Sequence, residues 1–275
     1  MDQMILAFEC DAENVAMCAP ENVSDLFVFP PLFPDSEMFS WVTRTHVLIV
    51  LAALLAIGLM IFGLRKRRLV PTKFQLVAES AFNFVDQGIA KDVIGHGGQR
   101  YTPYLLSIFL FILFGNLFEV TPLIHFPITS RMAIPAFLAL VTWFIFVIAG
   151  IAKQGLGYFG HLLWPPGVPV ALKPLVGVIE FISTIFVRPF SLAVRLFANL
   201  VAGHVMLSLL LGTAGIFIWG ALTGDLPWTK GLTGGAWFVL GLGIYVFEIL
   251  VAVLQAYIFT LLSAVYIQTS VHPEH

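Results

Sequence analysis

Long apolar runs dominate the pattern of hydrophobic and polar positions along this chain, and short polar or Gly/Pro-rich stretches separate them. A run of about 18 or more apolar residues is long enough to cross a bilayer as a helix. The sequence lacks the short alternating segments that a membrane barrel needs. The pattern predicts an all-α, polytopic membrane bundle. The expected spans are residues 46–64, 103–120, 132–152, 174–212 and 236–268.

The last two apolar blocks are longer than a single vertical crossing requires. At 1.5 Å per residue, residues 174–212 and 236–268 would extend roughly 58 and 48 Å, against a hydrocarbon core of about 30 Å. We expect each block either to be broken or to form a long helix that crosses at a steep tilt. Pro189 is the candidate position for a kink in the first block.

Residues 72–94 have an amphipathic pattern that differs from that of the spans. The apolar residues of this segment recur at helical spacing, at Phe74, Val77, Ala78, Ala81, Phe82, Val85 and Ile89. The polar residues occupy the other face, at Lys73, Gln75, Glu79, Asn83, Asp86 and Lys91. The pattern is typical of a helix that lies in the membrane interface, and packing against a soluble partner domain is the alternative.

The distribution of charge sets the expected orientation in the membrane. Residues 1–40 carry eight acids and no Lys or Arg, and the basic run Arg65–Arg68 follows the first span directly. Basic residues beside a span mark its cytoplasmic end. We therefore expect an external N-terminal tail over residues 1–40, a single membrane domain over residues 41–275, and a cytoplasmic C-terminus.

The two cysteines of the chain, Cys10 and Cys18, both lie in this tail. They can form a disulfide if the tail is external, and they are ordinary thiols otherwise. The tail has neither the basic and apolar regions of a cleaved signal peptide nor the Arg-rich pattern of a transit peptide. These features favour a bacterial chain, in the cell (plasma) membrane.

Composition excludes several other classes of protein. The chain is 59% hydrophobic and 11% charged, with a mean hydropathy of +0.94 and a net charge of −2, so no overall basic surface favours nucleic acid. HExxH and GxSxG motifs are absent from the sequence, and the glycine run Gly95–Gly98 lacks the strand, Lys and helix of a phosphate loop. We therefore expect no catalytic activity, no cofactor and no metal, and a lipid bilayer as the immediate surroundings.

One apolar stretch, Arg188–Leu207, contains charged and polar residues that are costly inside a membrane. Arg188, Arg195 and Asn199 are spaced by seven and four residues, which places them on one face of a helix. His204 lies nine residues beyond Arg195, roughly 13 Å along a helix axis. A guanidinium keeps its proton, so Arg195 is suited to be a fixed positive charge. The alternative is that it pairs with a carboxylate inside the bundle of an ordinary permease.

Other polar residues also fall within or beside the expected spans. They are Asn116, Glu119, Glu180, Glu248 and Gln255. Glu248 and Gln255 are seven residues apart and therefore share one face of the last helix. Ionisable groups inside a membrane usually mark an ion or proton pathway, and imidazole titrates near neutral pH. The alternative roles are a buried structural pair for the ionisable groups and helix–helix hydrogen bonding for the amides.

The whole stretch resembles the signature of subunit a, the membrane stator of rotary F-type ATP synthases. The matching residues are Pro189, Ser191, Leu192, Arg195, Leu196, Phe197, Asn199, Ala202 and Gly203. A second segment, LQAYIFTLLSAVY over residues 254–266, resembles the second signature of the same family. The resemblance covers the chain from about residue 40 onward.

The resemblance implies two offset proton half-channels, an inlet from outside and an outlet to the cytoplasm, which meet at a rotating c-ring. It implies that Arg195 faces the ring between them, and that His204 and Glu248 form an acid–imidazole pair. By the same resemblance, Asn116 and Glu119 line the inlet. Asn199 and Gln255 hold water or orient their neighbours. The implied partners are the c-ring, the peripheral-stalk b subunits and, indirectly, the catalytic head, where ATP is made.

Glu180 is implied as a residue of the outlet. The family usually has an acid fourteen residues before the arginine, whereas Glu180 lies fifteen before Arg195, so its facing is left open. The alternative function is a self-contained proton or ion channel or transporter of the plasma membrane, which would need a continuous polar path within this chain. The sequence has no internal repeat of the kind found in many carriers. It does not distinguish protons from sodium ions.

Overall fold

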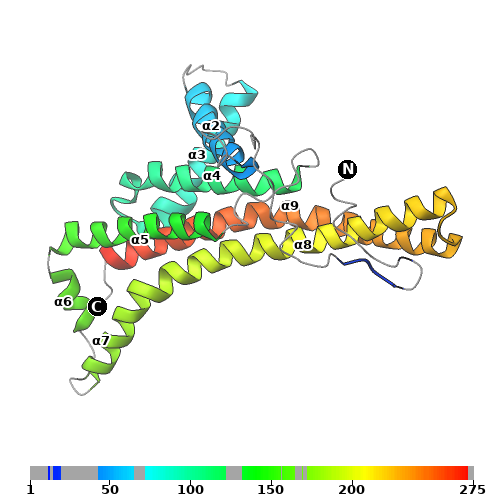
Figure 1. The fold of residues 1–275 in the computed structure, drawn as a ribbon. Helices are drawn as coiled ribbons and strands as arrows, with labels where there is room; N and C mark the ends of the chain where they lie inside the picture. The colour runs from blue at the N-terminus through cyan, green and yellow to red at the C-terminus, as the bar shows by residue number, and fades with distance from the viewer. Residues whose placement is uncertain are drawn as a thin grey trace, which may run out of the picture. The chain divides into compact units, whose positions relative to one another are not determined.

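The structure is a computed structural model, and it describes residues 43–64, 72–121, 132–155, 157–164 and 172–271, together with residues 12, 15–19 and 169. Every regular element in this part of the chain is a helix (Figure 1), and five helical segments are long and apolar enough to cross a membrane. The prediction of an all-α membrane protein with five spans is therefore confirmed. The basic run Arg65–Arg68 lies outside the described residues.

The described helices follow one another along the chain with short connections. They are α2 (Arg44–Leu64), α3 (Lys73–Val85), η2 (Asp86–Ile94), η3 (Gly98–Arg100), α4 (Thr102–Val120), α5 (Ala133–Gln154), α6 (Gly157–Leu163), α7 (Lys173–Ile182), η5 (Ser183–Val187), α8 (Arg188–Thr223) and α9 (Trp228–Val271). Of these, η2 and η5 are π-helical and η3 is a 3₁₀ turn.

Contacts divide the chain into two compact units. The first unit comprises Met1–Val50, Asn116–Ser130 and Asn199–Val253, and the second comprises Leu51–Gly115, Arg131–Ala198 and Leu254–His275. The helices α2, α4, α8 and α9 each contribute residues to both units. Each unit is described by itself below, and a single membrane domain over residues 41–275 stays a prediction.

The first three spans match the predicted bounds to within two residues, but the last two are longer than expected. Residues 173–223 form one helical segment of 51 residues, and α9 has 44 residues. The predicted limits at residues 212 and 236 are wrong, because most of the Gly- and Thr-rich sequence between them is helical.

Close packing between α8 and α9 explains why this Gly-rich sequence is helical in the first unit. A Cβ at Gly234 would lie 2.9 Å from the Cβ of Phe217, and one at Gly231 would lie 2.8 Å from the Cβ of Ala221. Small residues allow helices in a membrane to approach closely, and their packing stabilises the pair. The two helices therefore run side by side almost to the turn that joins them, shown in yellow and orange in Figure 1.

A short N-terminal segment, residues 15–19, packs on this helix pair within the first unit. The Cys18 amide donates to Thr213 Oγ1 at 3.1 Å, and the Thr213 hydroxyl donates to the Cys18 carbonyl at 3.2 Å. The Cys18 side chain is fully buried and disulfide-bonded. The only other cysteine in the sequence, Cys10, lies outside the described residues.

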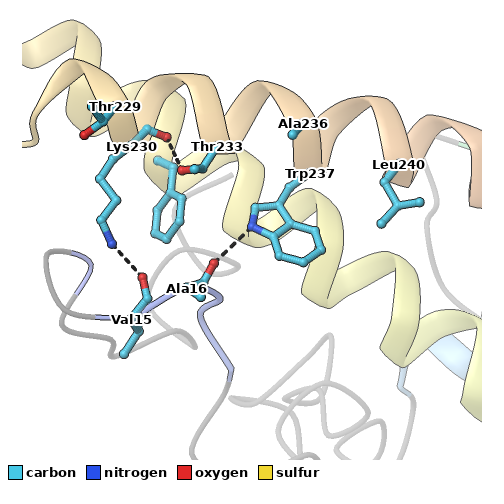
Figure 2. Close-up of a pocket in the computed structure, with 9 residues that line it drawn as sticks. Val15, Ala16, Thr229, Lys230, Thr233, Ala236, Trp237 and Leu240 are labelled. Carbon is cyan, nitrogen blue, oxygen red and sulfur yellow. Dashed lines mark hydrogen bonds between the residues drawn. The ribbon is translucent and has the colours of Figure 1, made fainter.

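Two side chains at the start of α9 also hold this segment, as Figure 2 shows. Lys230 Nζ donates to the carbonyl of Val15 at 2.7 Å, and Trp237 Nε1 donates to the carbonyl of Ala16 at 3.0 Å. The segment thereby forms one wall of a 570 Å³ pocket beside α9. Residues 15–19 of the predicted N-terminal tail therefore pack against α9, and these donors satisfy part of their backbone.

The polar face predicted for residues 72–94 is only partly exposed. Gln75 and Asp86 are buried, whereas the apolar Phe74 and Val77 are 52% and 56% exposed. A membrane protein turns apolar side chains towards lipid and keeps polar groups where they find partners. A position of this helix in the membrane interface stays a prediction.

Asp86 joins the interfacial segment to the start of α4 in the second unit. Its carboxylate forms an ion pair with Lys91 at 2.7 Å and accepts a hydrogen bond from the Thr102 hydroxyl at 2.8 Å. The hydrogen bond from Lys91, supported by that from Thr102, holds the pKa of Asp86 below its usual value of 3.8 despite burial. The ionised carboxylate therefore stabilises this contact.

We predict that Asp86→Asn lowers the thermal stability of the protein in mild detergent. Because the pKa of Asp86 is lowered on folding, its contribution is present above the unfolded value of 3.8 and is lost as the pH falls through the folded value. The difference between wild type and variant should be constant from about pH 8 to about pH 4 and shrink only below that range.

The matched control for this prediction is Asp92→Asn, because Asp92 is exposed on the same π-helical segment. It should leave stability unchanged at every pH. Equal stability of the two variants would show that the contacts of Asp86 with Lys91 and Thr102 do not hold α4 to the interfacial segment.

Candidate functional site

Most of the predicted inlet residues lie in the first unit, on three helices. Asn116 and Glu119 come from α4, His204 comes from α8, and Glu248 comes from α9. All four are buried, with exposed fractions of 1%, 3%, 3% and 8%. Asn199 belongs to the same unit and is half-buried. The structure thus places the predicted residues away from the surface, as a protected path requires.

The Glu248 carboxyl group packs directly on the backbone of α8 at Gly203. A Cβ at Gly203 would lie 2.7 Å from Glu248 Cδ and Oε2 and 2.8 Å from Oε1. Only a glycine leaves room for the carboxyl group at this position. The residue that follows it is His204, so α8 and α9 bring the carboxyl group to the turn that carries the imidazole. The glycine in the signature therefore has a steric reason.

The inlet residues on α4 also contact α9. The Asn116 side chain donates from Nδ2 to the carbonyl of Ala252 at 3.3 Å. The carboxyl groups of Glu119 and Glu248 lie close enough to interact electrostatically.

Several buried polar atoms of the first unit have no hydrogen-bond partner among the described residues. They are Asn116 Oδ1, Glu119 Oε1 and Ser208 Oγ. Buried polar atoms are normally satisfied, and ordered water is a common partner where protein groups do not suffice. Ser208 was missed from the sequence, although its position one turn after His204 could have indicated it.

Arg195 belongs to the second unit and is exposed, unlike its neighbours on α8. Leu192 and Leu196, the residues three before and one after it, are buried, with exposed fractions of 1% and 0%. Within the part of the chain that the structure describes, Arg195 has no ion pair and no hydrogen bond from its side chain. Its charge therefore points out of the unit.

Arg188 differs from Arg195, because the second unit provides partners for it. Arg188 Nη1 donates to Thr269 Oγ1 at 3.2 Å, and the guanidinium lies 5.4 Å from the ring centre of Tyr266. Both partners lie near the C-terminal end of α9. The contacts make Arg188 an anchor between α8 and α9.

The π-helical segment η5 lies between Glu180 and Arg195. The Arg188 amide donates to the Ser183 carbonyl five residues back, which is the π pattern. A π turn inserted in an α-helix takes up one additional residue. An additional residue in a regular helix would turn Glu180 by about 100° around the axis. A π turn at this place compensates for such a rotation, and the facing of Glu180 stays a prediction.

Further polar residues of the second unit are buried near Glu180 and the end of α9. Gln255 is buried, and its Nε2 has no partner among the described residues. The same holds for Thr184 Oγ1, four residues after Glu180, and for Ser270 Oγ. Gln154 Nε2 donates to the Ser270 carbonyl at 2.8 Å. Thr184, Gln154 and Ser270 were missed, because hydroxyl and amide groups near helix ends are common and carry little signal alone.

The chemistry available at these positions is proton exchange by carboxyl and imidazole groups, with amides and hydroxyls as hydrogen-bonding partners. In the described part of the chain, no three His, Cys, Asp or Glu side chains are grouped so that they could hold a metal ion.

The fold and these positions define a polytopic membrane protein with ionisable groups inside its helices. Residues 46–268 match the family model described as "ATP synthase A chain", and the chain belongs to this family. It is 42% identical to ATP synthase subunit a of Frankia alni over 240 residues, which cover 86% of this chain and 80% of the relative. It is 34% identical to ATP synthase subunit a of Streptomyces lividans over 275 residues, covering 98% and 95%.

We predict that Gly203→Ala lowers ATP-driven proton pumping in membrane vesicles by about tenfold or more, because small displacements of a reacting group are costly. The new methyl group would occupy the space of the Glu248 carboxyl group and displace it.

The matched control is Gly215→Ala, on the same helix, where a Cβ meets nothing within 4 Å. This variant should pump normally, since Ala favours a helix over Gly by roughly 1 kcal/mol. Normal pumping by Gly203→Ala, at matched protein levels, would refute a functional contact between Glu248 and this turn.

Proposed function

We propose that this chain is the proton-translocating stator subunit a of an F-type ATP synthase, with two offset half-channels that meet at a c-ring. Protons enter one half-channel, pass to a carboxylate of the ring, and leave by the other half-channel after the ring has turned. The chain itself makes and breaks no bond of ATP. It binds the c-ring and the peripheral-stalk b subunits, and it acts on the catalytic head through the rotor.

The observation that carries this proposal is the exposed guanidinium of Arg195. A charge at the apolar surface of a membrane helix is costly unless a polar or charged group covers it. The described residues of this chain provide no such group. A carboxylate on a neighbouring subunit would satisfy it, and the positive charge would favour the ionised form of that carboxylate. Because a guanidinium does not release its proton, it also blocks direct proton passage.

The buried residues of the first unit support an inlet in this proposal. Glu119 on α4 and Glu248 on α9 lie in electrostatic range, Asn116 bonds to α9, and Glu248 packs on Gly203, the residue before His204. The polar atoms without protein partners are suited to bind water along the way. Asn199 belongs to the same unit and is suited to orient a water or a neighbouring side chain.

The polar residues of the second unit support an outlet. Glu180 and Thr184 lie four residues apart, one helical turn, before the segment that carries Arg195. The additional residue that left the facing of Glu180 open is absorbed by η5. Gln255 is buried and its Nε2 has no partner among the described residues, so it is also suited to hold water. The outlet would end at the cytoplasmic side.

The proposed orientation has an external N-terminus and a cytoplasmic C-terminus. The disulfide of Cys18 supports it, because disulfides persist in oxidising compartments and are rare in the cytosol. The chain is a multi-pass bacterial membrane protein, and this orientation places the turn between α8 and α9 outside.

We predict that Arg195→Ala abolishes coupled ATP synthesis and ATP-driven proton pumping in vesicles, while the protein still inserts and assembles. Arg195→Lys should lose most activity too, because an ammonium differs from a guanidinium in shape and hydration. Arg188→Ala is the matched control and should keep a substantial part of the activity, since Arg188 is bound within this chain by Thr269. Wild-type pumping by Arg195→Ala would contradict the proposed function.

We predict that an impermeant thiol reagent labels at least one of the two native cysteines in intact cells once an impermeant reductant has opened the disulfide. A cysteine introduced by Glu274→Cys, near the other end of the chain, should be labelled only after lysis. The orientation would be wrong if the native cysteines were protected in intact cells and became reactive only after lysis.

A further inference from the structure

The side chain of Tyr245 joins the end of α4 to α9 within the first unit. Its hydroxyl donates to the carbonyl of Val120 at 2.5 Å. Val120 is the last residue of α4 and directly follows Glu119. Tyr245 precedes Glu248 by three residues, so the two side chains lie on the same side of α9, about one turn apart.

A second side chain joins the same two helices further along. Asn116 Nδ2 donates to the carbonyl of Ala252 at 3.3 Å. Residues 116 and 120 of α4 thus pair with residues 252 and 245 of α9, in antiparallel order. Glu119 lies between the two ties on α4, and Glu248 lies between them on α9. The two hydrogen bonds therefore bracket the pair of acids.

The geometry points to Tyr245 as a positioning residue for proton uptake: its bond to Val120 fixes the separation between the carboxyl groups of Glu119 and Glu248. This inference rests on the proposed function. The titratable groups near the contact are Glu119 on α4 and Glu248 on α9, and His204 on α8 follows the glycine on which Glu248 packs. Because the two carboxyl groups interact electrostatically, a change in their separation alters how they exchange protons.

The ordinary role of such a bond would be to cap α4, since the last carbonyl groups of a helix have no partner within it. A capping bond affects stability and the amount of assembled protein, whereas a positioning bond also affects the pH at which the acids exchange protons. The pH profile of transport therefore separates the two roles.

The test is Tyr245→Phe, which removes only the hydroxyl group, assayed as ATP-driven proton pumping across a range of pH at matched protein levels. We expect the rate near neutral pH to fall by about threefold to tenfold, the size expected for one hydrogen bond. We also expect the pH of half-maximal rate to shift by at least about half a unit. An unchanged pH profile would overturn the inference, whatever the overall rate.

The matched control is Tyr104→Phe. The Tyr104 hydroxyl donates to Thr142 Oγ1 at 2.7 Å and joins α4 to α5 in the second unit, without contact to the acid pair. This variant should keep the wild-type pH profile. In a Glu119→Gln background, Tyr245→Phe should cause no further shift, and a full additional shift there would also overturn the inference.

The Arg195→Ala variant, assayed in parallel, separates this inference from the proposed function. If Arg195→Ala pumps normally, the proposed function fails. If Arg195→Ala is inactive and Tyr245→Phe keeps the wild-type profile, the proposed function stands and only the role of Tyr245 fails.

Discussion

The uncompensated charge of Arg195 is the constraint on which this account depends. The helix buries Leu192 and Leu196 against its own unit and turns the guanidinium outwards, where a bilayer would penalise it. No described residue of the chain neutralises it. A surface of this kind needs a partner with an acidic group, and that requirement connects the fold of one chain to the assembly of a larger complex. Arg188, a turn or two earlier, shows the contrast, because Thr269 and Tyr266 satisfy it internally.

The residues proposed for the inlet differ from those of a stable core in how their buried polar atoms are hydrogen-bonded. A core satisfies each buried polar atom once and permanently, whereas a proton path needs groups whose bonds can change. The first unit combines both features. The packing of Glu248 on Gly203 and the hydrogen bonds between α4 and α9 restrict the positions of the acids. Glu119 Oε1 and Ser208 Oγ have no hydrogen-bond partner among the described residues, so they can bind water that exchanges. The helices thus keep fixed positions, while a few of their buried polar atoms can change hydrogen-bond partners.

The sequence predicts the helical class, the five spans and the buried ionisable residues, because long apolar runs and charges within them are local signals. It does not predict where α8 and α9 end, since their Gly-rich ends are stabilised only by packing against each other. The hydrogen bond between Cys18 and Thr213 connects residues 195 positions apart in the sequence, and no local sequence pattern predicts such a contact. In the sequence, the only sign of the π turn η5 is that Glu180 lies one residue further from Arg195 than is usual in the family. Ser208 was overlooked because a single hydroxyl in a span is common.

The most direct test of the central claim is to determine what covers the Arg195 face of α8. Cysteines would be introduced by Ala198→Cys, exposed three residues after Arg195, and by Leu196→Cys, which is buried. The background would carry serine at positions 10 and 18. A second cysteine would be placed in the c-ring subunit, beside the carboxylate that carries the proton. Under oxidation in assembled membranes, the account predicts a disulfide to the ring from position 198 and none from position 196. A disulfide from position 196 alone would contradict it.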